Sequence, residues 1–164
     1  MRWHRVLGPD RIKLELRTPP GDPEEEMAAG REERKEAILW ELVELLERSG
    51  KVVNANKLFI DLRNRERKAT TGIGEGLAIP HVRTIQAREF VVALGRSTPG
   101  IDFGSIDGRR VHIFLAIVSP PYEDKAYLKV YQRVGRMFAG TDLVQRLLAA
   151  GDEHEIIRIL SDAG

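Results

Sequence analysis

The chain has 164 residues, 42% of them hydrophobic, so it can build one compact core and is too short for two. Its 26 basic and 25 acidic residues leave a net charge of +1, which argues against nucleic acid or an anionic membrane as a partner. The absence of cysteine excludes disulfides and thiolate zinc sites, and no stretch reaches the ~20 apolar residues of a membrane span. We therefore expect a single-domain, cytoplasmic protein without membrane insertion.

The first part of the chain predicts a short strand, a loop and a helix. Residues 12–16 alternate apolar and polar side chains, as a half-buried strand does. Residues 18–30 begin with a proline-rich, acidic run that cannot continue a regular element, so we expect a flexible loop there. Hydrophobic residues then recur at helical intervals over residues 31–49, and Gly50 is a residue type that ends helices.

A second helix and two strands are predicted next. Asn54 can cap the helix, and the charged residues 63–68 close it as a solvated helix end. Strands are predicted over residues 90–97 and 109–119. The second of these strands is so uniformly apolar that it must be covered on both faces and lie centrally in a sheet.

Helices are predicted for the remainder of the chain. Over residues 123–138 the apolar side chains recur at helical spacing, so one stripe can pack onto the sheet. Thr141 and Asp152 can cap two closing helices, over residues 142–150 and 153–162. Because strands and helices alternate, the sequence predicts an α/β fold with helices on both faces of one β-sheet.

Residues 70–81, with the sequence TTGIGEGLAIPH, place an imidazole directly after a glycine-rich turn and a short apolar strand. Glycines can adopt positive φ and bring bare N–H groups toward a ligand, and Pro80 fixes the direction of the chain before His81. A protein displays a nucleophilic histidine in this way. The alternative is a tight turn followed by a half-buried histidine, because a G-x-G-x-G segment alone is weak evidence.

Further segments accompany this one in a fixed order. They are Arg65-Glu66, residues 70–81, 90–94 and 100–108, and the apolar run 111–118 followed by Pro120. In this combination the chain resembles the type-2 enzyme IIA domains of the bacterial phosphoenolpyruvate-dependent sugar phosphotransferase system, the fructose and mannitol class, and is most similar to the nitrogen-regulatory enzyme IIA proteins. The resemblance implies one such domain over residues 1–164, with a mixed β-sheet and an insertion at residues 18–30.

The resemblance also implies a phosphorylated histidine. His81 would accept the phosphoryl group, because an imidazole with a pKa near 6.5 is neutral and nucleophilic at neutral pH and also leaves readily. Arg65 would face His81 with its guanidinium; a surface ion pair is the plainer alternative. The hydroxyl of Thr71 and the backbone N–H groups of the turn at Gly72, Gly74 and Gly76 would bind the phosphate oxygens. For the hydroxyl of Thr71, stabilisation of the turn is the plainer alternative.

Tyr127 occupies the position where the family pattern has a second histidine, in the pair Tyr127-Leu128. Its hydroxyl can donate a hydrogen bond to a phosphoryl oxygen or to His81, but with a pKa near 10 it stays neutral where a histidine would titrate. Tyr127 would then act as a catalytic residue together with His81 and Arg65, with slower transfer. Alternatively, Tyr127 belongs to the apolar stripe of its helix.

The implied function is that of a phosphotransferase component. His81 would receive phosphate from a histidine phosphocarrier protein, and the chain would regulate target proteins such as transporters or kinases; a single domain without attached IIB or IIC segments favours this nitrogen-regulatory role. Two alternatives stay open. A sugar-specific enzyme IIA would pass phosphate to a cysteine of an enzyme IIB, and a pure binding module would not transfer it. The four histidines lack metal-ligand spacing, so we expect no metal and no other cofactor.

Overall fold

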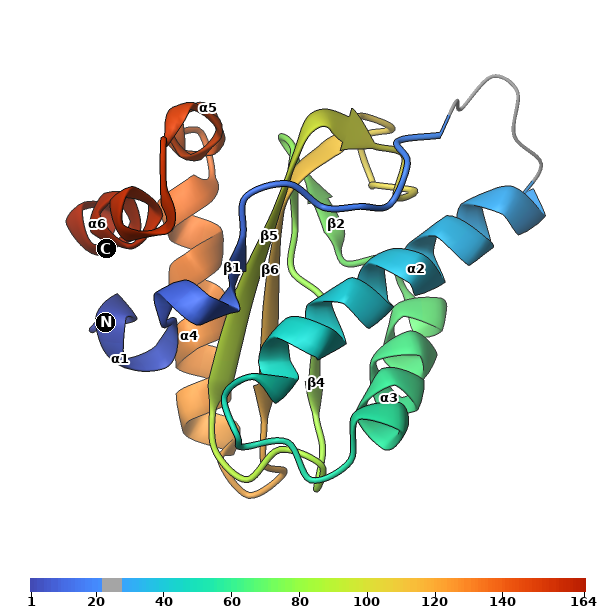
Figure 1. Ribbon diagram of the computed structural model, residues 1–164, viewed down its shortest axis with the longest axis vertical. Helices are drawn as coiled ribbons and strands as arrows, with labels where there is room; N and C mark the ends of the chain where they lie inside the picture. The colour runs from blue at the N-terminus through green and yellow to red at the C-terminus, as the bar shows by residue number, and fades with distance from the viewer. Residues whose placement is uncertain (22–27) are drawn as a thin grey trace.

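The computed structural model describes residues 1–21 and 28–164 and folds them around one β-sheet (Figure 1). The helices are α1 (Trp3–Val6), the 3-10 turn η1 (Pro9–Arg11), α2 (Ala28–Glu47), α3 (Ala55–Lys68), α4 (Asp124–Phe138), α5 (Leu143–Ala149) and α6 (Glu153–Ala163). The strands are β1 (Ile12–Lys13), β2 (Gly72–Gly74), β3 (Leu77–Ala78), β4 (His81–Arg83), β5 (Val91–Ile101) and β6 (Val111–Ser119). Among the described residues, no helix combines the length and the apolar character that crossing a membrane requires.

The sheet is mixed, and β6 is its central strand, as its apolar sequence predicted. β6 pairs antiparallel with β5 on one side and parallel with both β3 and β4 on the other. β1 extends the sheet beyond β5, and β2 extends it beyond β3. Along β6, Leu77 of β3 lies opposite Ile113, whereas His81 of β4 lies opposite Ile117. This register separates His81 from the glycine-rich turn along the length of the sheet.

The two faces of β6 contribute to two separate hydrophobic clusters. Ile113, Leu115 and Ile117 pack in a cluster with residues of α1, α4, α5 and α6, whereas Phe114 and Ala116 pack in a cluster with residues of α2 and α3. Figure 1 shows the same division, with α2 and α3 on one face of the sheet and α4 on the other. Successive strand residues point to opposite faces, so the predicted sandwich of one mixed sheet between helices is confirmed.

The first strand is shorter than the alternation over residues 12–16 predicts. β1 ends at Lys13, and beyond it the carbonyl of Leu14 accepts a hydrogen bond from Nε of Arg96 (2.9 Å), while the N–H of Leu16 donates to the carbonyl of Arg96 (2.8 Å). The same guanidinium donates to the carbonyls of Leu147 and Ala150 at the end of α5. The side chain of Arg96 and one backbone hydrogen bond thus hold residues 14–16 beside β5.

The predicted loop over residues 18–30 is only partly described, since residues 22–27 lie outside the described ranges. Its first part is tied to the body of the protein. Thr18 donates through its backbone N–H and its hydroxyl to the buried carboxylate of Glu41, at 2.9 and 2.5 Å. At the other end of the predicted loop, α2 begins at Ala28, three residues before the helix start that the sequence predicted.

The helix caps that fix the ends of α3 and α6 follow the sequence. Oδ1 of Asn54 accepts from the backbone N–H of Lys57 (2.9 Å), and Oδ1 of Asp152 accepts from that of Glu155 (2.8 Å). Both are N-cap hydrogen bonds of the kind that satisfy the free N–H groups of a first helical turn. With its start fixed in this way, α3 runs to Lys68 and carries the Arg-Glu pair of its last turn toward β4.

Candidate active site

His81 is the first residue of β4, at an edge of the sheet between the two helical layers. Arg65 approaches its ring from α3, and two tyrosines approach it from α4. The ring borders a cavity of about 570 Å³, whose lining residues are Arg65, Lys68, His81, Val82, Arg83, Pro121 and Tyr127. Although His81 is only 7% exposed, this cavity gives its side chain access to the surface.

The backbone fixes the tautomer of the imidazole. Nδ1 of His81 lies 2.5 Å from the carbonyl oxygen of Ile79. A carbonyl can only accept, so Nδ1 carries the proton and Nε2 of the neutral ring keeps its lone pair. Nε2 faces Nη2 of Arg65 at 3.4 Å, on the side of the cavity. The nitrogen turned toward the cavity is therefore the nucleophilic one.

Burial favours the neutral form of this ring. It lowers the pKa of His81 below the ordinary 6.5, and the nearby Arg65 guanidinium lowers it further. The hydrogen bond to the Ile79 carbonyl and the carboxylate of Glu66 raise the pKa, but they do not offset the burial. Burial thus favours a neutral imidazole at neutral pH, with its proton on Nδ1.

Cationic side chains surround the mouth of the cavity. Arg65, Lys68 and Arg83 all line it, and they come from α3 and from β4. Arg65 is oriented by a hydrogen bond from Nη1 to the carbonyl of Ala69 (3.1 Å). The Arg83 guanidinium lies over the ring of Tyr127, 5.6 Å from its centroid. This charge arrangement suits an anionic group placed next to Nε2 of His81.

Two tyrosines one helical turn apart on α4 contact the imidazole. The ring centroid of Tyr127 lies 5.8 Å from that of His81, and the ring of Tyr131 lies closer, at 4.6 Å. Burial raises the pKa of Tyr127 to about 12, so its hydroxyl stays protonated and can only act as a neutral group. Tyr131 is part of the apolar stripe over residues 123–138, and its spacing of four residues from Tyr127 places both tyrosines on one helix face.

The hydroxyl of Thr71, predicted to bind phosphate, is directed elsewhere. It donates to Oε2 of Glu66 at 2.5 Å, and the backbone N–H of Thr71 donates to Oε1 of the same carboxylate at 2.9 Å. Thr71 is 2% exposed and does not line the cavity at His81. The N–H of Gly72 is also engaged, because it donates to the hydroxyl of Thr70 (3.1 Å). This geometry matches the plainer alternative, in which Thr71 stabilises the turn.

The structure does not bring Gly74 and Gly76 together with His81. Both adopt positive φ, at 101° and 85°, as the glycine-rich turn predicts. However, the carbonyl of Gly76 accepts from the backbone N–H of Ile113, whereas His81 lies opposite Ile117. Four strand residues correspond to about 13 Å. The two glycines are therefore too far from Nε2 of His81 to bind a phosphoryl group attached there.

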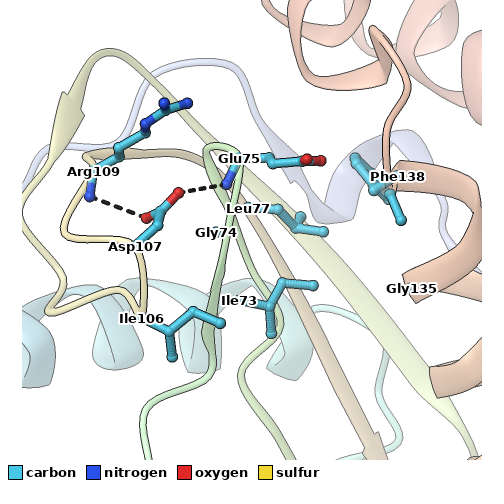
Figure 2. A pocket seen from close by; sticks show the side chains of 10 residues that line it. Ile73, Gly74, Glu75, Leu77, Ile106, Asp107, Arg109, Gly135 and Phe138 are labelled. Carbon is cyan, nitrogen blue, oxygen red and sulfur yellow. Dashed lines mark hydrogen bonds between the residues drawn. The ribbon is translucent and has the colours of Figure 1, made fainter.

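The glycine-rich turn instead borders a different cavity, of about 600 Å³, shown in Figure 2. Its walls include Ile73, Leu77 and Phe138, with Glu75 at the rim. The N–H of Glu75 donates to Oδ2 of Asp107 (2.9 Å), and its carboxylate accepts from the N–H of Gly140 (3.2 Å). Glu75 thus fastens the turn to the end of α4, rather than placing a negative charge near His81.

The fold and the site together define a class: a single-domain α/β protein in which a neutral imidazole at a sheet edge meets a cationic cavity. The chain belongs to the family described as phosphoenolpyruvate-dependent sugar phosphotransferase system, EIIA 2, whose sequence model matches residues 28–163. The members of this family are phosphotransferase components, as the name of the family states.

Individual relatives carry two kinds of name. The chain is 32% identical over 127 residues to the PTS system fructose-specific EIIABC component of Bacillus subtilis (strain 168), covering 77% of this chain and 20% of that much longer protein. It is 26% identical over 151 residues to a nitrogen regulatory protein of Pseudomonas aeruginosa, covering 92% of this chain and 96% of the relative. The crystal structure of nitrogen regulatory protein IIA-Ntr from Neisseria meningitidis has the same fold, with a TM-score of 0.81 at 23% identity, over 95% of this chain and 97% of that one.

Proposed function

We propose that this protein is a phosphoryl carrier in which Nε2 of His81 accepts the phosphoryl group of a phosphohistidine on a histidine phosphocarrier protein. The observation that carries the proposal is the hydrogen bond from Nδ1 of His81 to the Ile79 carbonyl. It leaves the lone pair of Nε2 facing Arg65 and the cavity. Membership of the family supports the same chemistry.

In the transfer step, the lone pair of Nε2 forms a bond to phosphorus while the bond between phosphorus and the donor nitrogen breaks. The donor imidazole leaves with that electron pair. The proton on Nδ1 of His81 stays in place, and the carbonyl of Ile79 stabilises the positive charge that develops on the ring. The reverse step passes the group on to an acceptor without any oxidant, reductant or metal.

Stabilisation of the phosphoryl oxygens falls to the cationic side chains of the cavity. Phosphoryl transfer depends mainly on positioning and on neutralising the charge of the oxygens. Arg65 already lies 3.4 Å from Nε2, and Lys68 and Arg83 line the same cavity. Tyr127 also lines this cavity, in the place where the family pattern has a second histidine. Phosphorylation adds about two negative charges, so the two forms differ in their affinity for a target.

A nitrogen-regulatory role is the form of this function that we favour. Its support is the relative named nitrogen regulatory protein, which aligns with this chain over 96% of its own length. A sugar-specific role is the second candidate, in which the phosphoryl group passes to a cysteine of an enzyme IIB. That candidate draws on the 32% identity to a fructose-specific component.

The test is direct phosphorylation. The purified protein is mixed with phosphoenolpyruvate, enzyme I and the phosphocarrier, and its intact mass is measured before and after acid treatment. We expect an acid-labile phosphoryl adduct that His81→Ala removes. His112→Ala is the matched control, because His112 also uses Nδ1 on a backbone carbonyl, that of Ser97, but borders a different cavity. A chain that gains no adduct would instead be a binding module without transfer activity.

The two roles are separated by the next acceptor. The phosphorylated protein is incubated with a purified enzyme IIB domain, and the phosphoryl group is followed by mass. Transfer to its cysteine would favour the sugar-specific role. Retention of the group on His81, together with target binding that changes on phosphorylation, would favour the regulatory role.

A further inference from the structure

A buried carboxylate lies behind His81 and has no place in the transfer step itself. Glu66 is 4% exposed and accepts three hydrogen bonds or ion-pair contacts from buried groups. Two come from the N–H and the hydroxyl of Thr71, and the third comes from Nζ of Lys35 at 3.0 Å. The carboxylate therefore joins α2, α3 and the segment that leads into β2 at one point.

From Thr71 the contacts continue to the imidazole. The carbonyl of Thr71 accepts from the N–H of Ile79 (2.9 Å), and the carbonyl of Ile79 accepts from Nδ1 of His81 (2.5 Å). The contacts from Lys35 to His81 thus follow one another through the backbones of Thr71 and Ile79. The N–H and the carbonyl of one residue belong to different peptide groups, so each contact acts by fixing the position of the backbone that bears the next hydrogen bond.

Stability alone does not account for the buried ion pair between Lys35 and Glu66. The same two helices are already joined by an ion pair at their surface, between Arg67 and Glu36 (2.9 Å). A buried ion pair adds little net stability, because removing its two charges from water costs about as much as their attraction returns. Glu66 also directly follows Arg65 on α3, so one short helix segment carries both the carboxylate and the guanidinium that lies beside the imidazole.

We propose that Glu66, held by Lys35, is a positioning residue that sets the orientation and the tautomer of His81 through Thr71 and Ile79. The inference rests on the proposed role of His81 as phosphoryl acceptor. In this proposal Thr71 does not bind phosphate, contrary to the prediction from the sequence. Its hydroxyl instead holds the Thr71 backbone, whose carbonyl in turn binds the N–H of Ile79. Loss of this support lets the ring rotate or exchange its proton to Nε2, which removes the nucleophile from the cavity.

The test compares two disrupting variants with two matched controls. Glu66→Gln keeps the size of the side chain but cannot accept from all its donors, and Thr71→Val removes only the hydroxyl. Thr71→Ser keeps that hydroxyl, and Glu36→Gln breaks the surface ion pair between the same two helices. We expect phosphorylation rates about 10- to 100-fold lower in the disrupting variants, the loss typical of a misplaced reacting group. The rate of Thr71→Ser, which keeps the donating hydroxyl, should be closer to that of the wild type than the rate of Thr71→Val, and the rate of Glu36→Gln should be unchanged.

The decisive readout is the ¹⁵N NMR spectrum of the His81 imidazole in the unphosphorylated protein. We expect the wild type and both controls to show the tautomer protonated at Nδ1, and Glu66→Gln and Thr71→Val to show a mixture. A lower rate with an unchanged imidazole spectrum would mean that Glu66 acts only on the fold, and would overturn the inference. The spectrum does not require phosphorylation, so an unphosphorylated wild type would refute the proposed function separately.

Glu66→Gln leaves the charge of Lys35 buried without its partner, which can cost enough to unfold the protein. The double variant Lys35→Met with Glu66→Gln removes both charges and keeps the volume. We expect it to fold, as measured by circular dichroism, and to show the same mixed imidazole spectrum as Thr71→Val. A folded double variant with the wild-type spectrum would overturn the inference.

Discussion

The guanidinium of Arg65 lies 3.4 Å from Nε2 of His81, while its other terminal nitrogen donates to the carbonyl of Ala69. The carbonyl holds the guanidinium in place, so the positive charge is already positioned where a phosphoryl group would attach. Its proximity also contributes to the lowered pKa of His81. The Arg65 side chain thus adds to the effect of burial on the imidazole, and it would also meet an anionic group bound at Nε2.

Replacement of Arg65 tests this double role. We expect Arg65→Ala to lower the phosphorylation rate by about 100-fold, in line with the loss of one pre-organised donor. The rate of Arg65→Lys should lie between those of Arg65→Ala and the wild type, because an ammonium group keeps the positive charge but lacks the planar guanidinium with its paired donors. Arg67→Ala is the matched control, two residues further along α3, where the side chain pairs with Glu36 away from the cavity. The rates are measured by stopped reactions and intact mass. Equal rates in Arg65→Ala and Arg67→Ala would rule out a role for Arg65 in the transfer.

The lowered pKa of His81 predicts a pH dependence with a definite sign. The folded protein binds a proton at His81 less readily than the unfolded chain, whose histidine has the ordinary pKa of 6.5. The neutral His81 therefore contributes to the free energy of unfolding. This contribution is fully present above pH 6.5 and is lost as the pH falls through the lower pKa of the folded state. We expect the phosphorylation rate to stay flat as the pH falls through 6.5 and to decrease only as the pH approaches the lowered pKa of His81 in the folded protein. An NMR titration midpoint at or above 6.5 for His81 would contradict the prediction. In His81→Gln, the free energy of unfolding should lose this part of its pH dependence.

Substitutions of Tyr127 separate a catalytic hydroxyl from a packing ring. We expect Tyr127→His to speed formation of the phosphoryl adduct, because it restores the titratable group of the family pattern. Tyr127→Phe should slow it by about 10- to 150-fold if the hydroxyl donates to the phosphoryl group, as a hydrogen bond to a charged group contributes about 1.5–3 kcal/mol. The control is Tyr131→Phe, which alters the other tyrosine against His81. If Tyr127→Phe transfers as fast as wild type, the ring serves only to pack α4.

A change in the glycine-rich turn tests its separation from His81. Gly76 has a φ of 85°, so alanine there should lower the free energy of unfolding by about 1–2 kcal/mol. The added Cβ would also lie 3.3 Å from Cγ1 of Val144. We expect the phosphorylation rate to stay the same, since this turn borders the other cavity. Gly108→Ala is the control for strain alone, with a φ of 72° and no atom within 4 Å of the added Cβ. A rate that fell only in Gly76→Ala would restore the predicted phosphate-binding role of the turn.

Local patterns in the sequence were enough to predict one sheet between two layers of helices, whereas its mixed strand directions were expected from the family resemblance. The apolar run of β6 indicated a central strand, and the helical spacing of apolar residues indicated helices for both faces. The caps at Asn54 and Asp152 marked helix starts that the structure has. The first strand was predicted too long, since beyond Lys13 the Leu14 carbonyl bonds to the guanidinium of Arg96, which is distant in sequence. Such a contact leaves no local trace in the sequence.

The candidate site was predicted in part, for a reason that lies in the pairing of strands. His81, Arg65 and Tyr127 do meet at one cavity. The glycines were grouped with His81 because they are its neighbours in sequence. In the structure, β3 and β4 follow one another along the same edge of β6, so the extended chain carries these neighbours apart. Periodicity also placed Tyr131 on the apolar stripe of α4. It could not show that the Tyr131 ring contacts the imidazole, because it does not distinguish one residue of the stripe from another.

The distance between the two cavities has a practical consequence for observing the protein at work. Ile106 borders the cavity remote from His81 and is 72% exposed, and the natural chain contains no cysteine. A single Ile106→Cys substitution therefore provides a unique thiol for a fluorescent dye, far from the imidazole. Attachment of the dye at that end of the sheet leaves the opposite end open, so encounters with donor and target proteins can be followed in real time.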